Sequence, residues 1–433
     1  MRTTGKLALA GITVLIFLAA GAIGAWLAFD AAETSDQDGS AKDAQTDPTD
    51  KPTGAATVSP VDLANPDLRS DEYVYDGKAP IYVSVYSHNE DSWEGLVNTA
   101  AKYRSYRAGL VERADLLRSY DIPWDWQSDQ PVIEAMIENE DDVDLLAATD
   151  GQNVLQYLES NGASIDPHAH TNNYADIAYL VERLGIQASG VIGGTVVNEC
   201  GGNVLGFYDL AGWHKNVDIQ DDGYVHGEDY PDALWKPTVL SDPGMGGHWF
   251  DDWSSGVWLP GDAEDFFVHD PNNEIVYIGE GYPHDASIIG PTHASGSIVH
   301  NADGQYIREL AEKIADNELP TGTKAGQRFM YTASIHMRDT DVVTDGDTPT
   351  NTAEGLGRVL DELQPLRDAG KIIFVDFETA AETWRSKYGS VPWRIDLSTF
   401  SFYDEILEQG ESYCSRNTER TRRTVPPTNE TPR

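Results

Sequence analysis

Strand-like and helix-like hydrophobic patterns alternate along the middle of the chain. Pro80–Tyr86 is rich in β-branched and aromatic residues and predicts a strand, and apolar residues then recur at steps of three and four from Tyr106 to Leu117, which predicts a helix. The alternation continues downstream, with strands predicted at 122–127, 163–170, 190–194, 274–279, 329–336 and 372–377 and helices at 131–140, 154–158, 177–184 and 356–366. Strands that alternate with helices imply parallel pairing, and about seven strands in one series favour an α/β fold of the (β/α) barrel type.

An irregular stretch from about 200 to 325 interrupts this series. It is rich in Trp, Gly and Asp and is too long for an ordinary connection between two elements. We therefore expect it to form functional insertions over one face of a barrel domain that spans residues 73–414.

The first 29 residues have a different pattern. Leu7–Phe29 contains no charged side chain, and as a helix it is long enough to cross the roughly 30 Å hydrocarbon core of a bilayer. Arg2 and Lys6 precede this run and Asp30 follows it, which places the amino terminus in the cytoplasm and the main domain outside. We expect one transmembrane helix that anchors the protein in the cell membrane, with a cleaved signal peptide and a secreted protein as the alternative.

Two polar segments flank the predicted domain. Residues 30–72 consist mainly of Asp, Thr, Ser, Ala and Pro, which is typical of a solvated, disordered linker. Residues 415–433 are polar and basic and are predicted to be a disordered tail. Neither segment indicates a protein partner.

The charge of the chain excludes one class of partner. With 72 acidic and 30 basic residues the net charge is -42, so nucleic acid is excluded as the main partner because its binding depends on Lys and Arg. Acidic residues spread along the whole chain favour a surface that stays hydrated in strong salt, and a halophilic source is our hypothesis. Calcium sites are the alternative, but no calcium-binding loop motif is present. The two cysteines, Cys200 and Cys414, could form one disulfide outside the cell.

The pair His168 and His170 lies at the end of the third predicted strand. In an extended segment, side chains two residues apart project from the same face, so both imidazoles could bind one metal ion. The alternative is that they are two exposed loop histidines, because this spacing alone is a weak pattern.

Polar clusters also follow other predicted strands, where a barrel of parallel strands carries its active site. These clusters are His88, Asn89, Glu90 and Asp91 after the first strand, Trp124, Asp125, Trp126 and Gln127 in the second, and His336 and Arg338 at a late one.

Three of these segments resemble the polysaccharide deacetylase family. Leu158–His168 is similar to the family's helix, turn and strand that end in a metal-binding histidine, and Ser334–His336 is similar to its late strand with the catalytic histidine. A helix over 359–366 and a last strand over 372–377 follow, as in the family. The resemblance covers roughly residues 79–385 and implies an irregular seven-stranded (β/α) barrel and a metal-dependent carbohydrate esterase.

The resemblance also implies roles for residues. Family members hold a divalent metal through one carboxylate and two histidines, use a second carboxylate as general base, and protonate the leaving group with the late histidine. By this likeness His168 is the first metal histidine and His336 the general acid. The carboxylate roles fall on Glu90 or Asp91. The family's second metal histidine corresponds to Asn172, so His170 has to substitute for it, with His88 as a further ligand and zinc as the expected metal.

Aromatic residues in the insertion suggest a carbohydrate substrate, because sugar rings pack on aromatic faces while their hydroxyls pair with polar groups. The alternative is that these aromatics only anchor long loops. The residues predicted to bind substrate are Trp124, Trp126, Gln127, Trp253, Trp258, His248 and Arg338.

These observations together predict an extracytoplasmic, metal-dependent hydrolase that removes acetyl groups from a polysaccharide or cell-surface glycan. One alternative is a glycoside hydrolase on a related barrel, in which paired carboxylates such as Glu90 and Asp125 cleave the sugar bond. The other is a catalytically inactive glycan-binding surface protein.

Overall fold

The computed structural model describes most of the predicted barrel domain and two residues of the predicted linker, in several separate ranges. The described ranges are 61–62, 79–91, 95, 97–169, 171–194, 217–241, 256–261, 268–279, 302–319, 321–322, 327–337 and 353–394. The chain divides into two units, Met1–Pro52 and Thr53–Arg433, and every described residue belongs to the second. No helix within the described ranges is both long and apolar enough to cross a membrane. The predicted anchor, the tail and both cysteines lie outside these ranges.

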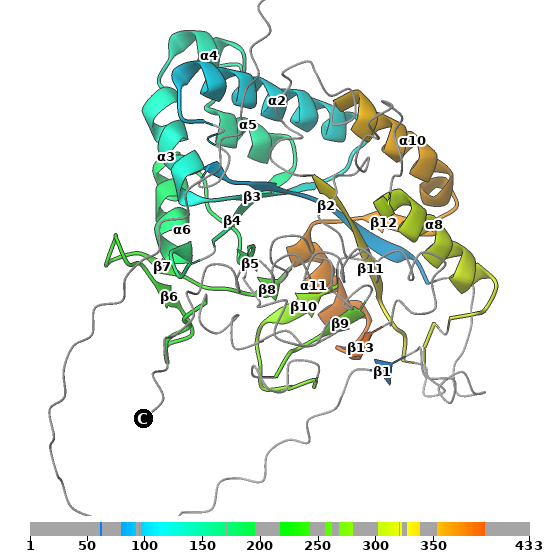
Figure 1. Cartoon of the computed structure of the whole chain (residues 1–433). Coiled ribbons are helices and arrows are strands. Elements are labelled where there is room, and N and C mark those ends of the chain that lie inside the picture. The colour runs from blue at the N-terminus through cyan, green and yellow to red at the C-terminus, as the bar shows by residue number, and fades with distance from the viewer. Residues whose placement is uncertain are drawn as a thin grey trace, which may run out of the picture. The chain divides into compact units, whose positions relative to one another are not determined.

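Seven parallel strands lie side by side and form the centre of the domain (Figure 1). A parallel bridge between His168 and Gly193 connects the first four strands to the last three. In spatial order the strands are β11 (Tyr331–Met337), β2 (Ile81–Asn89), β3 (Trp124–Ser128), β4 (Ala163–Pro167), β5 (Val191–Ile192), β8 (Val239–Leu240) and β10 (Val276–Ile278). This α/β arrangement fits a (β/α) barrel, as the alternating pattern predicts.

The seam between β10 and β11 makes the barrel irregular. Strand β9 (Gly256–Trp258) runs antiparallel to β10, and the backbone N–H of Gly256 donates to Oγ1 of Thr332 in β11 at 3.2 Å. Strand β12 (Ile372–Phe374) pairs with the first half of β2, and β3 pairs with its second half. The short strand β1 (Val61–Asp62), inside the predicted linker, pairs with β13 (Trp393–Arg394). A hairpin of β6 (Val225–His226) and β7 (Leu234–Trp235) stands apart from the barrel sheets.

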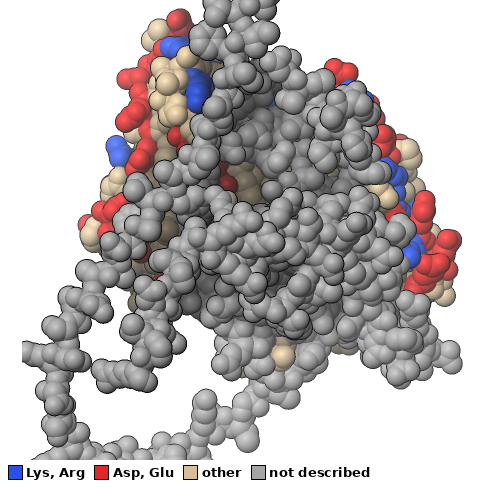
Figure 2. Space-filling view, viewed as in Figure 1, with Lys and Arg blue, Asp and Glu red and all other residues tan. Residues whose placement is uncertain are grey.

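Helices cover the outside of the sheet, and polar residues set where several of them begin. The helix α2 (Ala100–Ser119) begins after Thr99, α3 (Gln130–Asn139) after Asp129 and α5 (Val154–Ser160) after Asn153, and each of these side chains accepts a bond from a backbone N–H of the first turn. The other outer helices are α4 (Val143–Ala147), α6 (Tyr174–Arg183), α8 (Ala302–Ala315) and α10 (Ala353–Asp368). Figure 2 shows that the described flanks of the molecule carry mainly Asp and Glu, with Lys and Arg among them.

Alternation along the strands separates two buried clusters. In β2, Ile81, Val83 and Val85 belong to a cluster shared with the outer helices, whereas Tyr82 and Tyr86 belong to a second cluster with Val191, Val239, Val276 and residues of α11 (Phe377–Lys387). Glu378 of α11 accepts bonds from the N–H of Gly190 and Oγ1 of Thr238, which stand just before β5 and β8. Helix α11 therefore crosses the amino-terminal end of the barrel, and the opposite end carries the polar strand ends.

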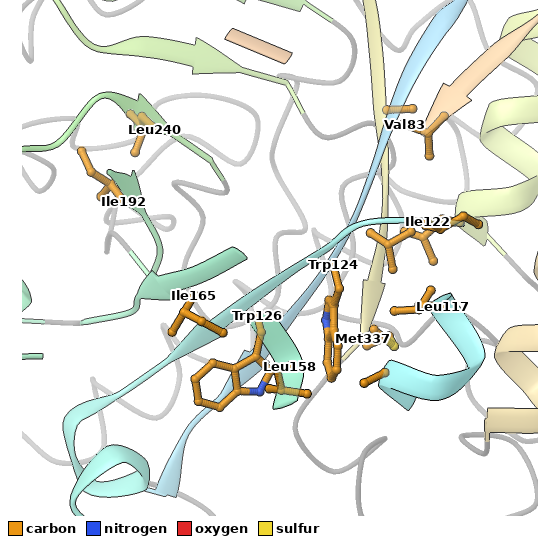
Figure 3. Close-up of a cluster of buried hydrophobic side chains, with 14 of the residues drawn as sticks. Val83, Leu117, Ile122, Trp124, Trp126, Leu158, Ile165, Ile192, Leu240 and Met337 are labelled. Carbon is orange, nitrogen blue, oxygen red and sulfur yellow. The ribbon is translucent and has the colours of Figure 1, made fainter. Parts of the chain in front are cut away.

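Three tryptophans predicted to bind substrate lie in the core instead. Trp124 and Trp126 are 1% and 0% exposed and face the outer helices, where Figure 3 shows their rings near Leu117 and Leu158. Trp258 is also fully buried, with its ring 4.3 Å from that of Tyr277. For Trp124 and Trp126 the reason is the alternation of β3, which turns these two residues outward and Asp125 and Gln127 toward the barrel interior. These rings leave no face open to a sugar.

Candidate functional site

The strand register brings polar side chains together at one end of the barrel. His88 of β2 stands beside Gln127 of β3, and Gln127 stands beside Asp166 of β4. On the other side of β2, His336 of β11 stands beside Tyr86. Residues that are neighbours in parallel strands point to the same face, so all five face the interior.

Three of the predicted site histidines lie next to one another. The ring centroids of His88 and His168 are 4.3 Å apart, and those of His88 and His336 are 4.8 Å apart. The rings come from β2, from the residue after β4 and from β11, and His168 and His336 are buried whereas His88 is partly buried. His170 lies outside the described residues, as do His248, Trp253 and Arg338.

Glu90 is the carboxylate that reaches this cluster. Its Oε1 lies 3.0 Å from Nε2 of His168, and its side chain is 19% exposed whereas that of His168 is 1% exposed. Asp91 instead organises the following loop, because its Oδ1 accepts from the N–H of Val97 at 2.7 Å and its own N–H donates to Asp129 at 3.1 Å. Of the two carboxylates between which the sequence could not choose, Glu90 is the one whose side chain contacts His168.

Two glycines leave room for the ring of His168. A Cβ on Gly194 would stand 2.6 Å from Nε2 and 2.7 Å from Cε1 of His168, and Gly194 has a φ of +73°, which L-residues rarely adopt. A Cβ on Gly193 would stand 3.2 Å from Nδ1 of His168. The ring therefore lies directly against a backbone that only glycine allows.

Two buried carboxyls lie below the histidines. Burial and the nearby charge of Asp166 raise the pKa of Asp125 well above its usual value, while Oδ1 of Asp125 accepts from the N–H of Phe377 at 3.1 Å. Burial also raises the pKa of Asp166 to about 7, although hydrogen bonds from Ser189 and Ser164 act in the opposite direction. Asp125 is fully buried and not at the mouth of the barrel, which separates it from Glu90.

Gln127 connects these carboxyls to the next strand. Its Nε2 donates to Oγ of Ser241 at 3.0 Å and lies 3.5 Å from Oδ2 of Asp166. Ser241 and Tyr86 are site residues that sequence reasoning missed. Ser241 follows a two-residue strand that is too short to detect by periodicity, whereas Tyr86 could have been found from its position two residues before His88 on the same face.

The types of donor at this site fit a divalent metal such as zinc. Imidazole nitrogens are preferred zinc ligands, and His88 and His168 are the described residues that would hold the ion. Within the described ranges no group of three or more His, Cys, Asp or Glu side chains is arranged to hold a metal. The further ligand that the sequence predicts, His170, lies outside those ranges.

A separate pocket of about 620 Å³ lies at the other end of the barrel. It is bordered by residues before or at the start of β4, β5 and β8, among them Ser164, Gly190 and Thr238, and by Glu378 of α11. None of the site histidines lines it. We therefore place the candidate site at the histidine cluster and not in this pocket.

Comparison with known proteins finds no matching family profile and no matching curated protein. Solved structures that resemble the fold include a 4-alpha-glucanotransferase from Thermococcus litoralis, with 9% identity and a TM-score of 0.40, which covers 80% of this chain. This chain spans 48% of the length of that enzyme.

Two further solved structures have similar scores. A candidate glycoside hydrolase/deacetylase from Parabacteroides distasonis has 10% identity and a TM-score of 0.41 and covers 74% of each chain. A candidate polysaccharide deacetylase from Mycobacterium smegmatis has 8% identity and a TM-score of 0.35 and covers 73% of this chain and 94% of its own. Because these identities and TM-scores are low, the function has to be inferred from the site itself.

Proposed function

We propose that this protein is a metal-dependent hydrolase that removes acetyl groups from a polysaccharide or cell-surface glycan. The observation that carries the proposal is the pairing of Glu90 with His168 at 3.0 Å, with the rings of His88 and His336 beside them at the carboxyl ends of parallel strands. A carboxylate and several imidazoles in one site can supply the general base, the general acid and the metal ligands for hydrolysis of an acyl bond.

Each residue has a distinct role in this proposal. His88 and His168 hold the metal, with His170 as the further predicted ligand. A bound divalent metal supplies Lewis-acid activation of water and of the acyl carbonyl. Glu90, which is partly exposed, takes the proton from the attacking water at a carboxylate oxygen. His336, which is stacked on Tyr86, delivers a proton to the leaving atom of the sugar.

The location of the protein is a separate proposal that depends on the sequence alone. The apolar run Leu7–Phe29 tethers the domain to the membrane from outside the cytoplasm, or is cleaved to release it. A glycan at the cell surface is then within reach of the site.

The test measures bound zinc and released acetate with acetylated xylan and acetylated chitooligosaccharides as substrates. We expect Glu90→Gln to keep zinc and lose about 10²- to 10⁴-fold in acetate release, as is typical when a general base is removed. His168→Ala should lose both. His226→Ala is the matched control, because this histidine of β6 is exposed and its ring pairs with Asp222, away from the site.

Two outcomes would contradict the proposal. Acetate release at the full rate after the metal has been removed with a chelator would show that the reaction does not need a metal. Release of reducing ends without acetate would instead favour a glycoside hydrolase.

A further inference from the structure

Asn89 is a buried amide between two residues of the candidate site. It is the last residue of β2, it is fully buried, and it stands between His88 and Glu90 in the chain. From its contacts we infer that Asn89 is a positioning residue, which fixes the end of β2 so that the carboxylate of Glu90 stays beside His168. The catalytic consequence of this inference rests on the proposed function, in which Glu90 is the general base.

The side chain of Asn89 points away from the histidine cluster. Its Nδ2 donates to Oγ of Ser87 at 2.9 Å, and the same Oγ accepts from Nε1 of Trp124 at 3.1 Å. Trp124 faces the outer helices, so this polar group lies on the outer side of the sheet. The residues on either side of Asn89 reach the interior instead, because His88 and Glu90 both contact His168.

The amide of Asn89 joins the end of β2 to two other elements. Its Nδ2 also donates to the backbone carbonyl of Gln127 in β3 at 2.9 Å, and its Oδ1 accepts from the hydroxyl of Tyr106 in α2 at 2.8 Å. The backbone carbonyl of Asn89 accepts from the N–H of Asp129 at 3.1 Å. A buried polar group that loses its partner costs free energy, so these bonds hold the end of β2 in one position relative to β3 and α2.

The residue on the other side of Glu90 is held independently. The N–H of Asp91 donates to Oδ2 of Asp129 at 3.1 Å, and Oδ1 of Asp91 accepts from the N–H of Val97 at 2.7 Å. Loss of the Asn89 amide therefore frees the backbone at Glu90 on one side only. We expect this to displace the carboxylate while the loop after it keeps its contacts. A displacement of about 1 Å can cost about 10²-fold in the rate of a catalysed reaction.

The first test measures the position of Glu90 without metal or substrate. In a crystal structure of the metal-free full chain, Asn89→Ala should lengthen the distance from Oε1 of Glu90 to Nε2 of His168 from 3.0 Å to more than about 3.5 Å. A distance that stays at 3.0 Å in Asn89→Ala would overturn the inference.

Asn161→Ala is the matched control for this test. Asn161 is also a buried amide that bonds through both of its polar atoms, with Nδ2 donating to the carbonyl of Tyr157 and Oδ1 accepting from Arg118. It stands just before β4, at the end of the strand opposite His168. Asn161→Ala should therefore lower the thermal stability like Asn89→Ala but leave Glu90 beside His168.

The second test determines whether Asn89 acts through Glu90. Asn89→Ala should lower kcat for acetate release by about 10- to 10²-fold with little change in KM. If Asn89 acts through Glu90, the same substitution should cause no further loss in the Glu90→Gln background. An equal factor of loss in both backgrounds would show a general structural effect and would overturn the inference.

Tyr106→Phe covers the case in which Asn89→Ala does not fold. It keeps the aromatic ring and removes the hydroxyl that donates to Oδ1 of Asn89. We expect a smaller displacement of Glu90 and a smaller loss of kcat, and this loss should again be absent in the Glu90→Gln background. A Tyr106→Phe protein with Glu90 in place and kcat unchanged would overturn the inference.

The outcomes separate this inference from the proposed function. If Asn89→Ala keeps Glu90 at 3.0 Å from His168 and releases acetate like the wild type, the positioning role is wrong and the hydrolase proposal stands. If the wild type releases no acetate, the hydrolase proposal fails. The metal-free structures of Asn89→Ala and Tyr106→Phe then still decide whether Asn89 positions Glu90.

Discussion

The phenol ring of Tyr86 lies parallel to the imidazole of His336, with the ring centroids 4.6 Å apart and the planes at 9°. The same phenol meets His88 edge-on at 5.4 Å and Phe377 at 5.7 Å. Tyr86 therefore contacts two of the three clustered histidines and joins them to the first residue of α11. Its effect on the site is to hold the imidazole that we propose as proton donor.

Tyr86→Leu should slow acetate release and leave zinc binding unchanged. A stacked aromatic pair contributes about 0.5–1.5 kcal/mol beyond its buried area, so we expect kcat to fall by up to about 10-fold as His336 gains freedom. Tyr82→Leu is the control, because Tyr82 also faces the interior but packs edge-on against Tyr388. We would measure steady-state kinetics and thermal unfolding of both variants. An equal loss of kcat in both would refute a specific role for the stacking of Tyr86 on His336.

Gly194→Ala should displace the ring of His168. The new Cβ would come within 2.6–2.8 Å of three ring atoms, so the ring has to move from its present position. The control is Gly223→Ala, since Gly223 also has a positive φ, +83°, but no atom within 4 Å of an added Cβ. Both variants carry the cost of a strained backbone, about 1 kcal/mol or more. Zinc affinity should fall only in Gly194→Ala, and an equal affinity in the two variants would count against the tight fit of His168.

Asp125→Asn should flatten the pH dependence of stability. The raised pKa of Asp125 means that this carboxyl stays protonated in the folded protein while the same group ionises in the unfolded chain. The unfolded chain then binds fewer protons, so stability falls as pH rises above about 3.9, by at most about 1.4 kcal/mol for each pH unit, until the folded group ionises. The amide oxygen of Asn keeps the bond to the N–H of Phe377.

Urea unfolding from about pH 4 to about pH 8 measures this effect. We expect the advantage of Asp125→Asn over the wild type to be absent at the acidic end and to grow as pH rises. The exposed Asp141→Asn serves as control. Wild-type and Asp125→Asn curves that run parallel across the range would show that burial does not keep Asp125 protonated.

Arg107→Ala should lower the free energy of unfolding, because it breaks a buried ion pair between outer helices of the barrel. Nε of Arg107 bonds to Oε1 of Glu140 at 2.7 Å with both side chains 3% exposed, and Glu140 also accepts from Tyr103 and from the N–H of Val154. Removing one partner leaves a buried charge unpaired, which costs about 3–5 kcal/mol. Arg308→Ala, which breaks an exposed pair with Glu362, should cost about 1 kcal/mol or less. Chemical denaturation of both variants compares the two costs, and similar losses would contradict the burial argument.

The hydrophobic pattern alone predicts much of the fold. Long strands such as β2 and β11 and the amphipathic helix α6 lie where their periodicity places them, because side-chain alternation is a local property of the backbone. Strand β8 could not be predicted, since two residues inside a long irregular stretch have no detectable period. The parallel bridge between His168 and Gly193 links residues whose pairing no local pattern specifies.

The series of strands and helices, the excess of negative charge and the polar residues at the strand ends can all be predicted from the chain, because they depend on local composition and spacing. Three features emerge only from the folded barrel: Glu90 and not Asp91 pairs with His168, Trp124 and Trp126 face the helices, and Gln127 lies next to Asp166 in the interior. The physical reason is the register of parallel strands, which is set by long-range pairing and chooses the neighbours of every inward-facing side chain.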